Sequence, residues 1–213
     1  MENGLANGSA GAALPARERI MAVALELFAR HGLEVGVRDI VRAANLKNIS
    51  AIRYYFGSKE ALVRAVIVEG ARVAESWRRD ELKRLLARGK PTLREVLRIM
   101  VGPGGEVGMS HVYIRLLATV ILNNPELSPR RLAPELTREG YDACWRQVLK
   151  LVDGVPRRAL RARFEHVTIC ILSVVATRAV QADTAGRKTL WASRRDLENF
   201  IDSLEGMVTA TPS

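Results

Sequence analysis

A short segment at residues 49–56 combines an arginine and two hydroxyl side chains on what is predicted to be one face of a helix. At about 100° per residue, Ser50, Arg53 and Tyr54 fall together, and Ala51 lies beside them. An arginine can form two hydrogen bonds with guanine in the major groove of DNA, and hydroxyls can bind bases or phosphates. We therefore interpret this face as a DNA-reading surface. From this segment alone, an ordinary solvent-exposed helix face is an equally good interpretation.

The elements around this helix are predicted to hold it in place. Its opposite face is apolar and is expected to pack inward, with the members Ile49, Ile52, Tyr55 and Phe56. Two preceding segments with apolar residues at helical spacing, 15–31 and 37–44, would support it. Asn48 is predicted to cap this helix, and Ser58 to cap a long helix that continues to about residue 88. Such a set of helices is the helix-turn-helix arrangement, which places one helix in the major groove.

Residues 16–66 resemble the DNA-binding domain of the TetR/AcrR family of repressors. The most specific part is the block Tyr-Tyr-Phe-Gly-Ser-Lys-Glu-Ala-Leu at 54–62, and Ala-Leu-Glu-Leu-Phe at 24–28 also matches. The resemblance implies a dimeric repressor that binds a palindromic operator and is released by a small-molecule effector. An activator, or a regulator without an effector, remains the alternative within the same family.

The resemblance also implies which residues contact DNA. Ile49, Ser50, Ala51 and Arg53 match base-facing positions. Tyr54, Tyr55 and Lys59 match positions that bind the phosphate backbone, and Arg38 matches a groove-edge or phosphate contact. The full predicted set is Arg38, Lys47, Asn48, Ile49, Ser50, Ala51, Arg53, Tyr54, Tyr55 and Lys59. Because helix geometry places Ile49 and Tyr55 inward, these two rank below the others.

Two features depart from the family pattern. The turn at 45–47 is one residue longer than the commonest spacing, and the loop before the second helix is one residue shorter. Gly36 stands where a serine or threonine often caps that helix and contacts a phosphate. Glycine can cap a helix but cannot make the hydroxyl contact.

The remainder of the chain is also predicted to be helical, so the expected fold class is all-α with about nine helices. Further helices are predicted at 91–101, 109–123, 132–152, 157–182 and 194–207, with a glycine-rich loop at 102–105. The expected domains are a flexible tail at 1–14, a helix-turn-helix DNA-binding domain at 15–60, and an effector-binding and dimerisation domain at 61–213.

The helix predicted at 109–123 is apolar nearly all round, so it should lie inside the C-terminal domain. Its polar members His111 and Arg115 would need partners there, and a ligand carboxylate or hydroxyl could supply them. An internal ion pair, or an arginine that reaches the surface, satisfies the same residues. The candidate effector-binding residues are Met100, His111, Tyr113, Arg115, Tyr141, Trp145 and His166. Each of these could instead be an ordinary core residue.

The last two predicted helices carry apolar stripes that could form a dimer interface. In the family that the chain resembles, this helix pair forms a four-helix contact between two subunits. The predicted interface residues are Val167, Ile171, Val174, Val175, Leu197, Phe200, Ile201 and Leu204. Packing within a single chain is the alternative.

Composition and charge narrow the class of protein. A hydrophobic content of 48% with 26% charged residues is typical of a globular protein. The net charge is +10, but residues 15–60 hold eight Lys/Arg against five Asp/Glu, a net of +3. Charge is therefore only weak support for DNA binding by that segment. The sequence shows no paired catalytic groups, so we expect no enzyme, although a helical enzyme remains a remote alternative.

The sequence predicts no cofactor and no metal site, because the three histidines are far apart and no Cys-x-x-Cys motif occurs. Cys144 and Cys170 are expected to be buried free thiols. Without a signal-peptide pattern or a long apolar run, the expected location is the cytoplasm, on the nucleoid when DNA is bound. The expected partners are operator DNA, a second copy of the chain and a small-molecule effector, with no membrane.

Overall fold

The computed structural model describes residues 14–102, 111–133, 139–182 and 193–211. Across these ranges the secondary structure is helical and contains no strand, which confirms the all-α prediction. The helices are α1 (Ala16–His31), α2 (Val37–Ala43), α3 (Ser50–Phe56), α4 (Lys59–Ala87), α5 (Leu93–Val101), α6 (His111–Asn123), α7 (Pro129–Leu132), α8 (Glu139–Leu151), α9 (Arg157–Ala182) and α10 (Arg194–Thr209), with a 3-10 turn at Pro125–Leu127. The predicted tail and the 102–105 loop lie almost entirely outside the described residues.

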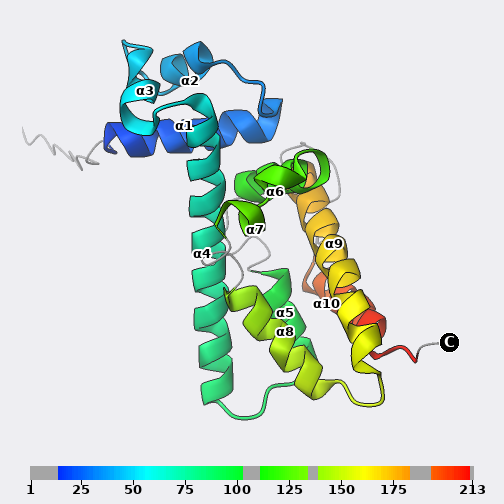
Figure 1. Ribbon diagram of the computed structural model, residues 1–213. Coiled ribbons are helices and arrows are strands. Elements are labelled where there is room, and N and C mark those ends of the chain that lie inside the picture. The colour runs from blue at the N-terminus through cyan, green and yellow to red at the C-terminus, as the bar shows by residue number, and fades with distance from the viewer. Residues whose placement is uncertain (1–13, 103–110, 134–138, 183–192, 212–213) are drawn as a thin grey trace, which may run out of the picture.

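Helix α4 connects the two parts of the molecule (Figure 1). At its N-terminal end, α1, α2 and α3 form a small head, and the remaining helices form a body along the rest of α4. Helix α8 packs along α4 and α5, while α6 packs against both α1 of the head and α9 of the body. The head is therefore in contact with the body through α6 as well as through the continuous helix α4.

Local sequence explains where the head helices end. Gly32 and Gly57 follow α1 and α3 with φ of 81° and 83°, a backbone conformation that favours glycine. The Ser58 hydroxyl oxygen accepts a hydrogen bond from the Ala61 backbone N–H at 3.1 Å, which confirms the predicted cap of α4.

The buried apolar residues form two clusters. The head cluster is built on Ile20, Ala24 and Phe28 of α1, all fully buried, and it includes Leu116 and Val120 of α6. The body cluster joins α4, α5, α8, α9 and α10 around residues such as Leu97 and Met100. Helix α6 thus contributes side chains to both clusters, because its apolar residues cover most of its circumference.

The helix predicted at 132–152 is shorter than expected. It begins at Glu139 as α8, and the short α7 ends at Leu132, before residues 134–138 that lie outside the described part. Pro134 explains why the helical pattern could not continue upstream, since a proline disfavours helical backbone at the residue before it. Ala133 accordingly adopts φ −151° and ψ 74°.

No helix within the described ranges is both long enough and apolar enough to cross a membrane. The same ranges contain no group of three or more His, Cys, Asp or Glu residues that could hold a metal ion.

Candidate nucleic-acid interface and the body behind it

Helix α3 is held on the head by one face. Ile52 is buried and packs in the head cluster with Ile40 and Val41 of α2. Phe56 is half-buried, and the Arg17 guanidinium of α1 lies 5.2 Å from the centre of its ring. This short helix therefore has a fixed orientation, although only Ile52 is fully buried.

The opposite face of α3 is open to solvent, as the helix geometry predicts. Ser50, Arg53 and Tyr54 are exposed, and Tyr54 has 82% of its surface free. Ala51 is half-buried beside them. An exposed large aromatic residue on a seven-residue helix is unusual for a structural role, since it stabilises no core.

The prediction that Ile49 and Tyr55 point inward is wrong. Ile49 is 48% exposed and Tyr55 is 38% exposed. Ile49 lies at the very start of the helix, where no packed neighbour covers it. The Tyr55 ring packs edge-on against Tyr54 at 4.8 Å, instead of against the core. Both side chains therefore join the exposed surface, and the reason for ranking them lower disappears.

The turn between α2 and α3 uses two asparagines. Asn45 has φ of 53°, a left-handed conformation that asparagine tolerates better than most residues, and this allows the longer turn. The Asn48 side-chain oxygen accepts a hydrogen bond from the Ser50 backbone N–H at 2.8 Å, so Asn48 binds the first turn of α3, although the residue at the capping position is Ile49, which makes no side-chain cap. Asn48 and the neighbouring Lys47 are both exposed.

Two further cations flank α3. Arg38, in the first turn of α2, is exposed, and Gly36 before it makes no side-chain cap, as expected of a glycine. Lys59 is half-buried in the first turn of α4, where the free backbone N–H groups and the helix dipole favour an anion such as phosphate. The cations and the exposed face of α3 are thus presented by one end of the molecule.

The body contains a buried polar cluster that sequence reasoning missed, formed by Glu75, Arg78, Tyr141 and Thr168. Glu75 is 6% exposed, accepts a hydrogen bond from Arg78 Nη1 at 2.8 Å, and accepts another from the Tyr141 backbone N–H at 2.8 Å. The Tyr141 hydroxyl donates to the Thr168 hydroxyl at 3.1 Å. Arg78 Nε is buried and has no hydrogen-bond partner within the part of the chain that the structure describes. The signal in the sequence was Glu75 itself, which continues the inward stripe of α4 after Ala71.

Helix α8 meets α4 at this cluster with almost no space between them. A Cβ atom on Gly140 would lie 2.5 Å from the Glu75 backbone oxygen, so only glycine fits there. The N-terminal turn of α8 is therefore tied to α4 both by the Glu75 hydrogen bond and by close backbone packing.

Most of the predicted effector-binding residues lie inside the body. Met100, Tyr113, Tyr141 and Trp145 are buried, and Arg115 is half-buried. The Tyr113 hydroxyl donates to the Ile67 carbonyl at 3.0 Å, and burial raises the pKa of this phenol. The Trp145 ring packs 4.9 Å from the Phe164 ring. The prediction for His166 is wrong, because it lies on the exposed side of α9, and the side chain of His111 lies outside the described part.

The two cysteines differ in burial. Cys144 is buried, and desolvation raises the pKa of its thiol to about 12. Cys170 is half-buried rather than buried, and burial raises the pKa of its thiol as well. Both are free thiols, and raised pKa values make them poor nucleophiles.

The predicted dimer residues pack mainly against the core of their own chain. Val167, Ile171, Val175, Ile201 and Leu204 are buried within their own chain, and Val174, Leu197 and Phe200 are half-buried against the same core. The apolar stripes of α9 and α10 therefore mark the core side of each helix. The outer side of α9 instead exposes Ile169 by 52% and Val180 by 49%, with Ser173 and Thr177 between them.

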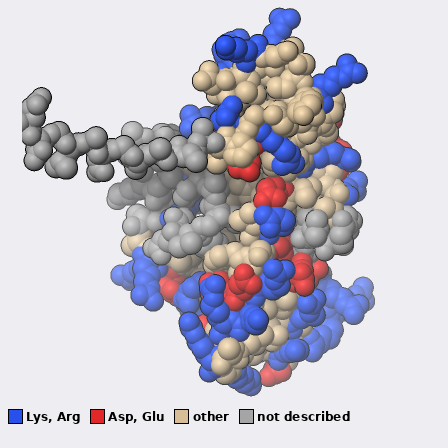
Figure 2. All heavy atoms as spheres, turned by 90° about the vertical axis from the view of Figure 1, so that its left-hand side faces the viewer, with Lys and Arg blue, Asp and Glu red and all other residues tan. Residues whose placement is uncertain are grey.

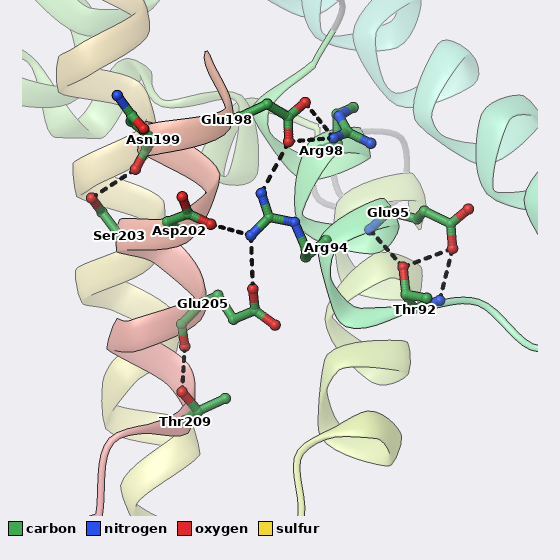
Figure 3. A network of polar contacts seen from close by, with 10 residues as sticks. All are labelled: Thr92, Arg94, Glu95, Arg98, Glu198, Asn199, Asp202, Ser203, Glu205 and Thr209. Atoms are coloured by element: carbon green, nitrogen blue, oxygen red, sulfur yellow. Dashed lines mark hydrogen bonds and ion pairs between the residues drawn. The ribbon is translucent and has the colours of Figure 1, made fainter. Parts of the chain in front are cut away.

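Helix α10 is fixed on α5 by ion pairs (Figure 3). Arg94 of α5 pairs with Glu198 at 3.0 Å, with Glu205 at 3.1 Å and also with Asp202. Arg98 pairs with Glu198 at 2.6 Å. These contacts set which side of α10 faces the body, and they leave Asn199, Ser203 and Gly206 exposed on the outside.

Known proteins match this chain in sequence over the head and in fold over nearly its whole length. Residues 20–66 match the family described as "Bacterial regulatory proteins, tetR family". A stretch of 88 residues is 36% identical to the HTH-type transcriptional dual regulator CecR of Shigella flexneri, and it covers 38% of this chain and 39% of that protein. The match thus spans well under half the length of the curated relative.

Solved structures extend the likeness to the body. AmtR of Mycobacterium smegmatis superposes with a TM-score of 0.59 at 15% identity, over 97% of this chain and 92% of AmtR. GusR of Salmonella enterica superposes with a TM-score of 0.56 at 17% identity, over 94% of this chain and 99% of GusR. At such identities the likeness concerns the fold alone. Over residues 20–66 the chain is thus similar in sequence to the tetR family of bacterial regulatory proteins, and over the body its likeness to AmtR and GusR is one of fold.

Proposed function

We propose that the chain is a repressor that binds a palindromic operator as a dimer and is released by a small-molecule effector. The observation that carries the DNA-binding part is the exposed row on α3, where Ser50, Arg53 and Tyr54 project from a helix fixed by Ile52. A helix so exposed at one end of a molecule can enter the major groove.

The exposed residues divide into two roles. Arg53, with Ser50 and Ala51, is suited to read base edges. The phosphate backbone is the proposed partner of the polar side chains around these residues, which are Tyr54, Tyr55, Arg38, Lys47 and Lys59. Ile49 lies among them as an exposed apolar residue. Asn48 contributes through its hydrogen bond to the Ser50 backbone N–H at the start of α3. Reading and positioning are thus assigned to different side chains.

Arg53→Ala and Lys59→Ala should weaken DNA binding in different ways. Loss of Arg53 should cost about 1–3 kcal/mol of specific affinity and relax the preference at one base pair. Loss of Lys59 should weaken binding to all sequences alike and reduce the salt slope by about one. Footprinting across a salt series measures both effects. The assignment fails if Arg53→Ala keeps both the affinity and the sequence preference of the wild-type chain.

The outer sides of α9 and α10 are the proposed dimer interface. Ile169 and Val180 are exposed apolar residues on α9, and small residues such as Ser173 and Gly206 allow helices to approach closely. The ion pairs of Arg94 fix the opposite side of α10 to α5. A dimer would place two copies of α3 about one helical turn of DNA apart, as a palindromic operator requires.

The proposed effector site lies in the body, next to the buried polar cluster. Its main support is Arg78, whose buried Nε has no hydrogen-bond partner among the described residues and whose guanidinium lies 5.3 Å from the centre of the Tyr141 ring. An acidic or carbonyl-bearing ligand could accept a hydrogen bond from this group. Native mass spectrometry of the purified chain should detect a bound compound that lowers DNA affinity when it is added back. Compounds that bind tightly without changing DNA affinity would contradict release by an effector.

Activation is a second candidate, favoured by one observation. The relative CecR is named a dual regulator, and its matched stretch is 36% identical to this chain. A reporter fused to the bound promoter separates the two functions, since deletion of a repressor raises expression and deletion of an activator lowers it.

A further inference from the structure

Nearly all the net charge of the chain lies at the end of the body that is farthest from the head. Residues 82–92 hold four Lys/Arg and no Asp/Glu, and residues 146–163 hold six Lys/Arg and one Asp. The two segments therefore carry a net charge of +9, and the rest of the chain carries a net charge of +1. We call their ten cations the basic end: Lys83, Arg84, Arg88, Lys90, Arg146, Lys150, Arg157, Arg158, Arg161 and Arg163.

Folding brings these two segments together. Four segments lie at the lower end of the molecule in Figure 1: the C-terminal end of α4, the loop to α5, the C-terminal half of α8 and the N-terminal turns of α9. Figure 2 shows Lys and Arg crowded over this end. Helix α4 has 29 residues and is therefore about 43 Å long at about 1.5 Å per residue. A straight duplex bound by α3 cannot reach the basic end across that distance.

The cations of the basic end are available for a partner. All of them are exposed except Arg163, which is half-buried and donates to the Val208 carbonyl. Arg157 is exposed and donates to the Leu149 carbonyl. Of these ten cations, only Arg84 makes an ion pair with a described residue, and that residue is Glu81. Concentrating like charges in this way destabilises the folded state through repulsion, so a uniform bias of the sequence toward arginine does not account for it.

We propose that the basic end binds the phosphate backbone of a second DNA duplex, without reading its sequence. Seven of the ten cations are arginines, whose planar guanidinium forms paired hydrogen bonds with phosphate. Duplex DNA offers one negative charge per about 1.7 Å of its axis, which matches a surface whose charges are mostly positive. With α3 on an operator, the molecule would then connect two DNA segments.

An acidic protein fits this surface less well. Specific protein interfaces have an apolar centre, commonly with large aromatic or aliphatic residues. Among the described residues of segments 82–92 and 146–163, Leu86 is the only large apolar residue that is exposed, and 42% of its surface is free. Attraction here must therefore come almost entirely from charge, which is how proteins bind DNA without sequence preference.

The test uses the full chain with the head neutralised by Arg38→Gln, Arg53→Gln and Lys59→Gln, and a short duplex of scrambled sequence as the probe. This variant should still bind the duplex, with an affinity that falls steeply as salt rises. Adding Arg146→Gln and Lys150→Gln, both exposed on α8, should reduce the salt slope by about two and the affinity by about tenfold or more. Lys83→Gln with Arg88→Gln, at the end of α4, should have the same effect.

The matched control is Arg194→Gln with Arg195→Gln, two exposed cations in the first turn of α10 that lie outside the basic end. It removes the same charge and should leave the affinity within about twofold, since only phosphate contacts release counterions. The proposal is overturned if the head-neutralised chain does not bind the duplex at low salt, or if the control weakens binding as much as the α8 pair. Equal affinity for polyglutamate also overturns it. None of these outcomes depends on sequence-specific binding by α3, which the Arg53 comparison tests separately.

Discussion

Glu75→Ala should lower the free energy of unfolding by about 3–5 kcal/mol, measured by denaturant unfolding of the full chain. The Glu75 side chain is 8% exposed and that of Arg78 is 12% exposed, so the substitution leaves a buried guanidinium without its counter-charge. It also removes the acceptor for the Tyr141 backbone N–H at the start of α8. Two buried donors would then lose the Glu75 acceptor at the contact between α4 and α8.

The matched control for this prediction lies six residues earlier on the same helix. Glu69 and Arg72 form an ion pair with the same spacing as Glu75 and Arg78, but their side chains are 48% and 55% exposed. Glu69→Ala should therefore cost no more than about 0.5 kcal/mol. If both variants lost the same amount, burial would not be the source of the effect, and the cluster would have no special role in joining α8 to α4.

Ile169→Glu should convert the proposed dimer into a monomer and lower operator affinity by about 100-fold or more. The residue is 52% exposed at the centre of the outer side of α9, where a carboxylate in each subunit would face its equivalent across the two-fold axis. A monomer engages only one half-site and loses the gain in affinity from linked binding. Sedimentation and DNA titration measure the two effects on the same sample.

Val73→Glu is the control for this substitution. Val73 is 38% exposed on α4, away from α9 and α10, so its change to glutamate adds the same charge without meeting the proposed interface. It should leave the chain dimeric. A dimeric Ile169→Glu variant, or a monomeric wild-type chain at the concentrations used for DNA binding, would contradict the assignment of this surface.

The helices of the head were predictable from the sequence because residues close together in the chain determine where these helices form and end. The spacing of Ile20, Ala24 and Phe28 and the cap at Ser58 each depend on neighbouring residues alone. The burial predicted from helix geometry was wrong for Ile49 and Tyr55. Residues near the ends of a short helix are packed against on some sides only, so their position on the helix does not decide whether they are covered. The apolar spacing before α8 predicted a helix that includes Ala133, but Pro134 disfavours helical backbone at that residue. Ala133 is not helical.

The body was less predictable because its sites depend on distant segments. An apolar stripe shows that a helix face is covered, but not whether its own chain or a second chain covers it. Val167 and Ile201 are covered by their own chain, and the exposed Ile169 belongs to no regular stripe. The cluster around Glu75 and the basic end each need segments far apart in sequence, such as 82–92 and 146–163, to be placed side by side.

Selection of duplexes from a random-sequence pool by the full chain tests the central claim most directly. The claim is that two copies of α3 read DNA with Arg53 as the principal base contact. The wild-type chain should enrich an inverted repeat whose half-sites lie about one helical turn apart, and Arg53→Ala should lose the preference at one position of each half-site. Enrichment of no sequence by the wild-type chain, or an identical motif from Arg53→Ala, would contradict it.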